Sequence, residues 1–206
     1  MSGAAAATPF LWFASRASGL AVLVSLSLVM VLGTATALGS TVRRLPRFVW
    51  SELHRTLALF SVAFLGLHVA TAILDPYVVI DWSALAAPFT SGYRTMATGL
   101  GTLAVDLGGA VLLTSLVRRR LGYRTWRAVH WLAYLAWPAA FIHSLTAGND
   151  LRIWWVAMIE TGSAAAVATA LLARLIQARR DRGRRATHIR RAEVSSQLVS
   201  QNGASG

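Results

Sequence analysis

The sequence predicts an all-α integral membrane protein, a bundle of five transmembrane helices with the N-terminus outside and the C-terminus in the cytoplasm. Of 206 residues, 55% are hydrophobic, and mean hydropathy is +0.53. The apolar residues form blocks longer than the ~18 residues that mark a membrane-spanning helix. All twenty basic residues are arginines, clustered between these blocks. Cysteine is absent, which excludes disulfides, thiolate-held iron–sulfur clusters and covalent c-type haem.

The apolar blocks divide the chain into three parts. We expect a short external segment at 1–10, a membrane domain at 11–176 and a basic, disordered cytoplasmic tail at 177–206. The leader MSGAAAATPF has no basic residue, and the first block is too long for the core of a signal peptide. The tail is charged and polar, which is typical of disorder. The predicted spans are residues 11–38, 49–74, 94–117, 126–146 and 153–176.

The placement of arginines predicts the direction of each span. Seventeen arginines flank the first and third loops and the end of the fifth span, whereas Arg16, Arg94 and Arg152 lie toward the other side. Positive residues are retained in the cytoplasm, so the tail is expected inside. The net charge of +12 would suggest nucleic acid for a soluble protein. Here membrane orientation accounts for it, and we expect no nucleic-acid partner.

Four of the five histidines lie inside predicted spans. His54 and His68 are on the second span, and His130 and His143 are on the fourth. Both spans run outward, so His54 and His130 are at the cytoplasmic side, and His68 and His143 are toward the outside. Separations of 14 and 13 residues correspond to rises of roughly 21 and 20 Å at ~1.5 Å per residue. The sequence therefore predicts two cross-helix imidazole pairs, one in each leaflet.

For this pairing to form, the fourth span must be wound differently from a regular helix between its two histidines. Fourteen residues are two heptads and bring His54 and His68 to one face, but thirteen leave His143 about 100° away from His130. Pro138 lies between the two and would kink or re-wind the helix. We expect a bend or bulge between Leu135 and Phe141.

The chemistry of the four ligands favours haem over a single metal ion. Zinc and copper sites need ligands that converge on one point, usually with carboxylate or sulfur, whereas these two levels are far apart. Two axial nitrogens per level suit a six-coordinate haem iron. Without cysteine the haem would be b-type. The expected sites are an inner iron held by His54 and His130 and an outer iron held by His68 and His143.

Two other classes stay open on the residues alone. An ion or metal transporter would use the intramembrane histidines with Asp106 and Glu160 as a relay. A membrane anchor would carry the histidines for structural reasons. Visible absorption separates them, because only haem binding requires a pigment.

Two segments of the chain resemble the ferric reductase-like transmembrane domain superfamily. They are HRTLALFSVAFLGLH and HWLAYLAWPAAFIH, with spacings H-x13-H and H-x12-H. That superfamily includes NADPH oxidases, ferric reductases and the bacterial haem membrane subunit of a periplasmic methionine sulfoxide reductase system. The likeness covers about residues 11–176. FTSGYRTMATGLGTLAV and LLTSLVRRRLGYRTWRAVHWL resemble the bacterial subunit in particular.

Three departures from these relatives bear on function. The bacterial subunit typically has Arg where this chain has His54, so the four-histidine set is more similar to the two-haem pattern. The oxidases continue into a flavin and nicotinamide module, whereas only about thirty polar residues follow the last span here. The oxidases also place an aromatic residue between the haems at the position of Ala136, and here the aromatic is the neighbouring Trp137.

The resemblance implies transmembrane electron transfer by a cytochrome b. A separate cytoplasmic flavoprotein or quinol would supply electrons, and an external acceptor (ferric iron, oxygen or a partner protein) would take them. The chain would then be the haem membrane subunit of an oxidoreductase without its own flavin or NAD site. A single-haem subunit of a periplasmic reductase is the alternative within the family.

Three further residues have candidate roles. Arg16 lies near the outer level and would bind a haem propionate or pair with Glu160. Trp137 falls between the two ligand levels and is a candidate inter-haem bridge, although packing alone would also place it there. The basic tail would dock a flavoprotein or anionic lipid.

Overall fold

The computed structural model describes residues 2–38, 46–75, 82–148 and 152–204, and within these ranges the regular secondary structure is helical. Four helices are long and apolar enough to cross a bilayer, over Pro9–Ala37, Phe48–Leu74, Thr95–Leu116 and Trp154–Arg184. The protein is therefore a multi-pass membrane protein. The helices are α1 (Ser2–Ala37), α2 (Arg47–Leu74), α3 (Ser83–Ala86), α4 (Thr95–Leu116), α5 (Arg118–Leu121), α6 (Tyr123–His130), α7 (Ala133–Ala147) and α8 (Trp154–Ala204).

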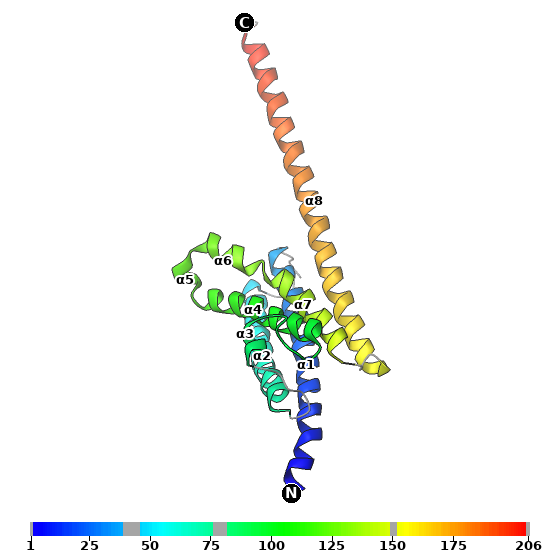
Figure 1. Ribbon diagram of the computed structural model, residues 1–206. Helices are drawn as coiled ribbons and strands as arrows, with labels where there is room; N and C mark the ends of the chain where they lie inside the picture. Colours follow the sequence, from blue (N-terminus) through cyan, green and yellow to red (C-terminus); the bar gives the residue numbers. More distant parts are fainter. Residues whose placement is uncertain (1, 39–45, 76–81, 149–151, 205–206) are drawn as a thin grey trace.

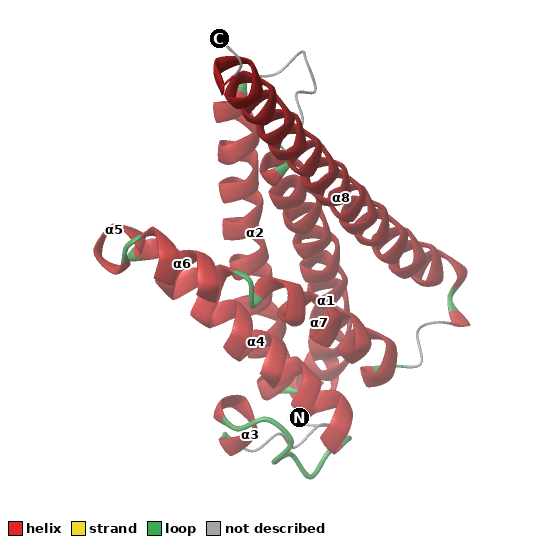
Figure 2. Cartoon of the chain, turned by 90° about the horizontal axis from the view of Figure 1, so that it is seen from above, coloured by secondary structure: helices red, strands yellow, loops and turns green. Residues whose placement is uncertain are grey.

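Helix α1 lies in the middle of the bundle, between α2 and α8 (Figure 2). It packs along α2 and α8 and also touches α7, while α4 packs against α6 and α7. Small residues allow the close approach of α1, because their hydroxyls bond to carbonyls of the preceding turn and leave no polar group unpaired. The buried residues of this kind in α1 are Ser18, Ser25, Ser27 and Thr34. The result is two helix groups, α1–α2 and α4–α6–α7, joined chiefly through α1.

The fourth predicted span is two helices rather than one. Helix α6 ends at His130 and α7 begins at Ala133, with backbone bonds from Leu132 N to Val129 O (2.9 Å) and from Leu135 N to Leu132 O (2.9 Å). These bonds reach back three residues, as in a 3₁₀ turn. The segment expected as the fourth span therefore consists of α6 and α7, and it is not among the four helices that are long enough to cross a bilayer by themselves.

The change of winding also lies earlier than predicted. Helix α7 runs through Pro138, and the tight turn precedes the expected interval from Leu135 to Phe141. Proline has no N–H to bond the carbonyl four residues before it, and its ring crowds that carbonyl. The carbonyl in question belongs to Tyr134, which lies in the tight turn. Each residue of 3₁₀ winding adds about 20° relative to an α-helix, so a few such residues recover most of the missing rotation.

The two ends of the chain are more helical than predicted. Helix α1 begins at Ser2, inside the expected external segment at 1–10. Helix α8 continues to Ala204 and projects well beyond the bundle (Figure 1), so it includes the stretch 177–204 for which the sequence suggested disorder. Alanine, arginine and glutamine are strong helix formers, and no proline interrupts this stretch.

The segment before α4 covers the N-terminal end of that helix. The hydroxyl of Thr102 donates to the carbonyl of Ala84 in α3 (2.6 Å). Phe89, with a positive φ of 67°, packs so closely on Gly99 that a β-carbon there would overlap its ring. These contacts fix the N-terminal end of α4, which carries residues of the site described next.

Candidate functional site

The four intramembrane histidines form two facing pairs. The ring centroids of His54 and His130 are 6.4 Å apart with planes inclined by 58°. Those of His68 and His143 are 6.2 Å apart with planes inclined by 78°. One ring of each pair comes from α2 and the other from the α6–α7 segment. The structure thus brings together all four residues that the sequence singled out, in the predicted pairs.

Three of these imidazoles are oriented by backbone carbonyls of a neighbouring helix. Their Nδ1–H groups donate to carbonyl oxygens at 2.7–3.1 Å. A carbonyl only accepts, so Nδ1 carries the proton and Nε2 keeps its lone pair. This is the usual outer contact of a metal-ligating histidine. The pairs are His54 with Val29, His68 with Ser15, and His143 with Ala97.

A glycine lies against each of the same three rings. A β-carbon on Gly33 would be 3.1 Å from Cε1 of His54, and one on Gly19 would be 3.1 Å from Cε1 of His68. On Gly101 it would be 2.8 Å from Cε1 of His143. In every case the glycine stands four residues after the residue whose carbonyl accepts the hydrogen bond.

This spacing has a simple cause. In an α-helix the carbonyl of residue i bonds the N–H of residue i+4, and the β-carbon of residue i+4 leans back toward that carbonyl. A glycine at i+4 leaves the side of the carbonyl open, so an imidazole can reach it. We call this arrangement a carbonyl–glycine cradle, formed by Ser15 with Gly19, Val29 with Gly33, and Ala97 with Gly101.

Sequence reasoning missed the cradles, although a signal was present. Gly19 and Gly33 in α1 are 14 residues apart, the same separation as His54 and His68 in α2. Two antiparallel helices with matched spacings meet at two matched levels. Gly19 then lies against His68, and Gly33 lies against His54.

His130 differs from the other three. Its Nδ1 is buried and has no hydrogen-bond partner within the described part of the chain. Its ring instead contacts that of Trp126, with centroids 5.0 Å apart and planes inclined by 30°. The surroundings of the His54–His130 pair therefore differ from those of the His68–His143 pair.

Arg16 follows Ser15, whose carbonyl holds His68, and so lies near the outer pair. Its guanidinium covers the ring of Trp12 at 4.7 Å. Glu160, the other partner considered for Arg16, is only 3% exposed and accepts a hydrogen bond from Ser144 (2.8 Å). Ser144 follows His143, so Glu160 supports the helix beside the outer pair.

Trp137 lies between the two levels. Its indole donates to Ser27 Oγ of α1 at 2.9 Å, and its ring stacks on Phe141 at 5.2 Å with an interplanar angle of 8°. Ser27 stands between Gly19 and Gly33 along α1, which places the indole at a depth between the two imidazole pairs. The tight turn before α7 gives Trp137 this direction.

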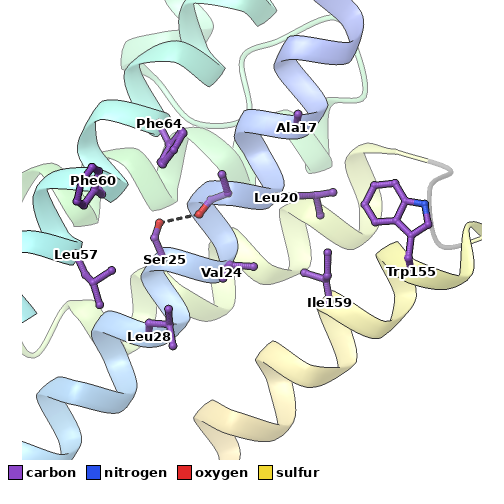
Figure 3. Close-up of a pocket in the computed structure, with 11 residues that line it drawn as sticks. Ala17, Leu20, Val24, Ser25, Leu28, Leu57, Phe60, Phe64, Trp155 and Ile159 are labelled. Carbon is purple, nitrogen blue, oxygen red and sulfur yellow. Dashed lines mark hydrogen bonds between the residues drawn. The ribbon is translucent and has the colours of Figure 1, made fainter. Parts of the chain in front are cut away.

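A transporter relay finds little support among the described residues. Asp106 is exposed on α4, and in the described ranges no three His, Cys, Asp or Glu side chains gather to hold one metal ion. An apolar groove between α1, α2 and α8 (Figure 3) has no titratable lining residue. Its α1 residues, such as Leu20 and Val24, lie on the face opposite Gly19 and Gly33, so the groove is separate from the histidine site.

Comparison with known families identifies the chain. Opposed imidazoles at two depths of an integral membrane protein are an arrangement suited to electron transfer. Residues 18–141 match the family described as ferric reductase like transmembrane component, and the chain belongs to that family. The match contains His54, His68 and His130, and His143 lies two residues beyond it. Membership implies transmembrane electron transfer with donor and acceptor partners, and the family typically binds haem. Comparisons with curated proteins and with solved structures give no match.

The imidazole pairs fit a haem iron. Two rings on opposite sides of one iron have centroids about 6 Å apart, because metal–imidazole nitrogen bonds are about 2 Å long. Both observed separations agree. In the described residues, α2 makes its extensive contacts with α1 rather than with α4, α6 or α7, so the rings face each other across helices that are not packed together.

Proposed function

We propose that this protein is a transmembrane electron conduit with two b-type haems, an inner one held by His54 and His130 and an outer one held by His68 and His143. The observation that supports this most strongly is the pair of ring separations, 6.4 and 6.2 Å, at two depths of one bundle. When bound, haem supplies a one-electron iron couple.

The protein's own residues prepare the ligand nitrogens. The cradle carbonyls hold the Nδ1–H groups of three histidines, which leaves each Nε2 lone pair available to a metal. Histidine on both sides leaves the iron no open position. This favours electron transfer over oxygen binding at the metal.

Two further residues have roles in this proposal. Arg16, beside the outer level, binds a propionate through its guanidinium, which offers two donors at once. Trp137 is the inter-haem bridge, supported by its depth and by its anchor on Ser27. An aromatic ring fixed between the two levels places polarisable π electrons on the path between them.

The direction of transfer follows from the arginine distribution. With seventeen arginines on the tail side, the pair His54–His130 faces the cytoplasm. A flavoprotein or quinol would be the electron donor on that side. An external acceptor, such as ferric iron, oxygen or a protein, would take electrons on the other side, and the chain would act as the haem subunit of an oxidoreductase.

Electron passage through vesicles tests the proposal. The protein is placed in liposomes that contain ferricyanide, and membrane-impermeant dithionite is added outside. We expect loss of ferricyanide that depends on the protein and falls at least tenfold in His68→Ala. The matched control His188→Ala, in the tail, retains the wild-type rate. Equal rates in protein-free and protein-containing vesicles would refute a conduit.

A further inference from the structure

Helix α4 forms a carbonyl–glycine cradle for His143 but not for His130. Gly101, which opens the cradle for His143, has its counterpart 14 residues later at Ser115, just as Gly19 is followed by Gly33 in α1. The carbonyl four residues before Ser115 belongs to Val111. A glycine at 115 would therefore complete a fourth cradle, at the level of His130.

Ser115 closes that fourth position. Its hydroxyl donates to the carbonyl of Val111 at 2.6 Å, and its β-carbon stands where the other cradles are open. The same hydroxyl accepts the indole N–H of Trp126 at 3.2 Å. The ring of Trp126 in turn contacts that of His130, with centroids 5.0 Å apart. The chain Val111–Ser115–Trp126–His130 thus replaces the direct contact between carbonyl and imidazole seen three times elsewhere.

The orphaned nitrogen of His130 follows from this replacement. The other three histidines each place Nδ1–H against a carbonyl, and a buried polar group without a partner is destabilising. At the corresponding place in α4 the carbonyl of Val111 accepts the hydroxyl of Ser115, and Nδ1 of His130 has no hydrogen-bond partner among the described residues. The His130 ring is held through its contact with Trp126 rather than through a hydrogen bond at Nδ1.

We propose that Ser115 and Trp126 are positioning residues that make the inner haem site chemically asymmetric. This rests on the proposed function. His54 binds the inner iron with its Nδ1–H anchored on Val29, and His130 binds it without such an anchor. An anchored Nδ1–H raises the basicity of the ligating nitrogen, which stabilises oxidised iron. Ser115 and Trp126 therefore raise the reduction potential of the inner haem above the value that a fourth cradle would give.

The test compares two substitutions that differ by one methyl group. Ser115→Gly opens the Val111 carbonyl to His130, whereas Ser115→Ala removes the hydroxyl but keeps the β-carbon in the way. We expect redox titration to show a lower inner-haem midpoint potential in Ser115→Gly, a smaller change in Ser115→Ala, and an unchanged outer haem in both. The inner component is the one that remains in His68→Ala.

A second readout does not require haem. In haem-free protein with ¹⁵N-labelled histidine, NMR should show a hydrogen-bonded Nδ1–H at His130 in Ser115→Gly and none in the wild type or in Ser115→Ala. If Ser115→Gly fails to fold, Trp126→Leu tests the same chain. Loss of the ring contact with His130 should lower inner-haem retention severalfold and leave the outer haem bound.

The outcomes separate the two proposals. Wild-type protein with two haems, together with equal inner potentials and equal His130 spectra in Ser115→Gly and Ser115→Ala, would overturn the positioning role and leave the conduit standing. Wild-type protein that binds no haem would overturn the conduit, and the NMR comparison would still decide whether Ser115 controls His130.

Discussion

Among the three cradle glycines, Gly101 leaves the least room for a side chain: a β-carbon there would lie 2.8 Å from both Cε1 and Nδ1 of His143. The ring cannot simply move away, because its Nδ1–H is bonded to Ala97 at 2.7 Å. Helix α4, which carries neither histidine of this pair, therefore sets the position of His143 on α7.

Gly101→Ala is expected to weaken the outer haem site. The added methyl displaces the His143 ring, so haem content per chain should fall from about two toward one, as measured by reduced-minus-oxidised spectra with quantified protein. Gly108→Ala, in the same helix with open space around the glycine, is the matched control and should keep both haems. Full haem content in Gly101→Ala would mean that the contact does not hold the ligand.

Trp137→Leu is expected to slow electron passage while haem content stays constant. The substitution removes the aromatic ring between the two levels and its hydrogen bond to Ser27, so the rate in the vesicle assay should fall severalfold. Trp131→Leu is the control, since Trp131 is 50% exposed and packs beneath Arg174. Equal rates in the two variants would assign Trp137 to packing alone.

Glu160→Ala is expected to destabilise the bundle without removing a haem. It leaves the half-buried hydroxyl of Ser144 without its acceptor, which removes a hydrogen bond worth about 1 kcal/mol. The apparent Tm in detergent should fall in Glu160→Ala. It should fall less in Glu160→Gln, which keeps an acceptor oxygen. A haem ratio that drops in Glu160→Ala would instead place Glu160 in the binding site.

The orientation of the chain can be tested with single cysteines, because the sequence contains none. In whole cells, a membrane-impermeant maleimide should label Thr90→Cys, in the segment before α4. Thr125→Cys, in α6 beside the arginine cluster, should react only after the membrane is opened. Labelling with the opposite preference would reverse the assigned direction of electron flow.

The sequence predicted the paired histidines well because the pairing depends on spacing along single helices. Residues 14 and 13 apart on two parallel spans must meet at two levels. What could not be predicted was the carbonyl that each imidazole contacts. Ser15, Val29 and Ala97 act through their backbones, so their side chains carry no signal, and only the spacing of Gly19 and Gly33 indicated a partner helix.

The position of the break in the fourth span was also beyond prediction. Pro138 marks a helix that must deviate, but the tight turn precedes it, where α6 and α7 meet. The helical tail was missed for a different reason. Charge and polarity suggested disorder, whereas the high helix propensity of Ala and Arg allows α8 to continue through Gln177 to Ala204.

The haem-to-protein ratio of purified wild type, His54→Ala and His68→Ala tests the central claim most directly. Two b-type haems in the wild type and one in each variant, with distinct reduced spectra for the two survivors, is the predicted result. A single haem lost only in His68→Ala would contradict the two-haem account and leave His54 without a ligand role. A wild-type protein that binds no haem would contradict the account altogether.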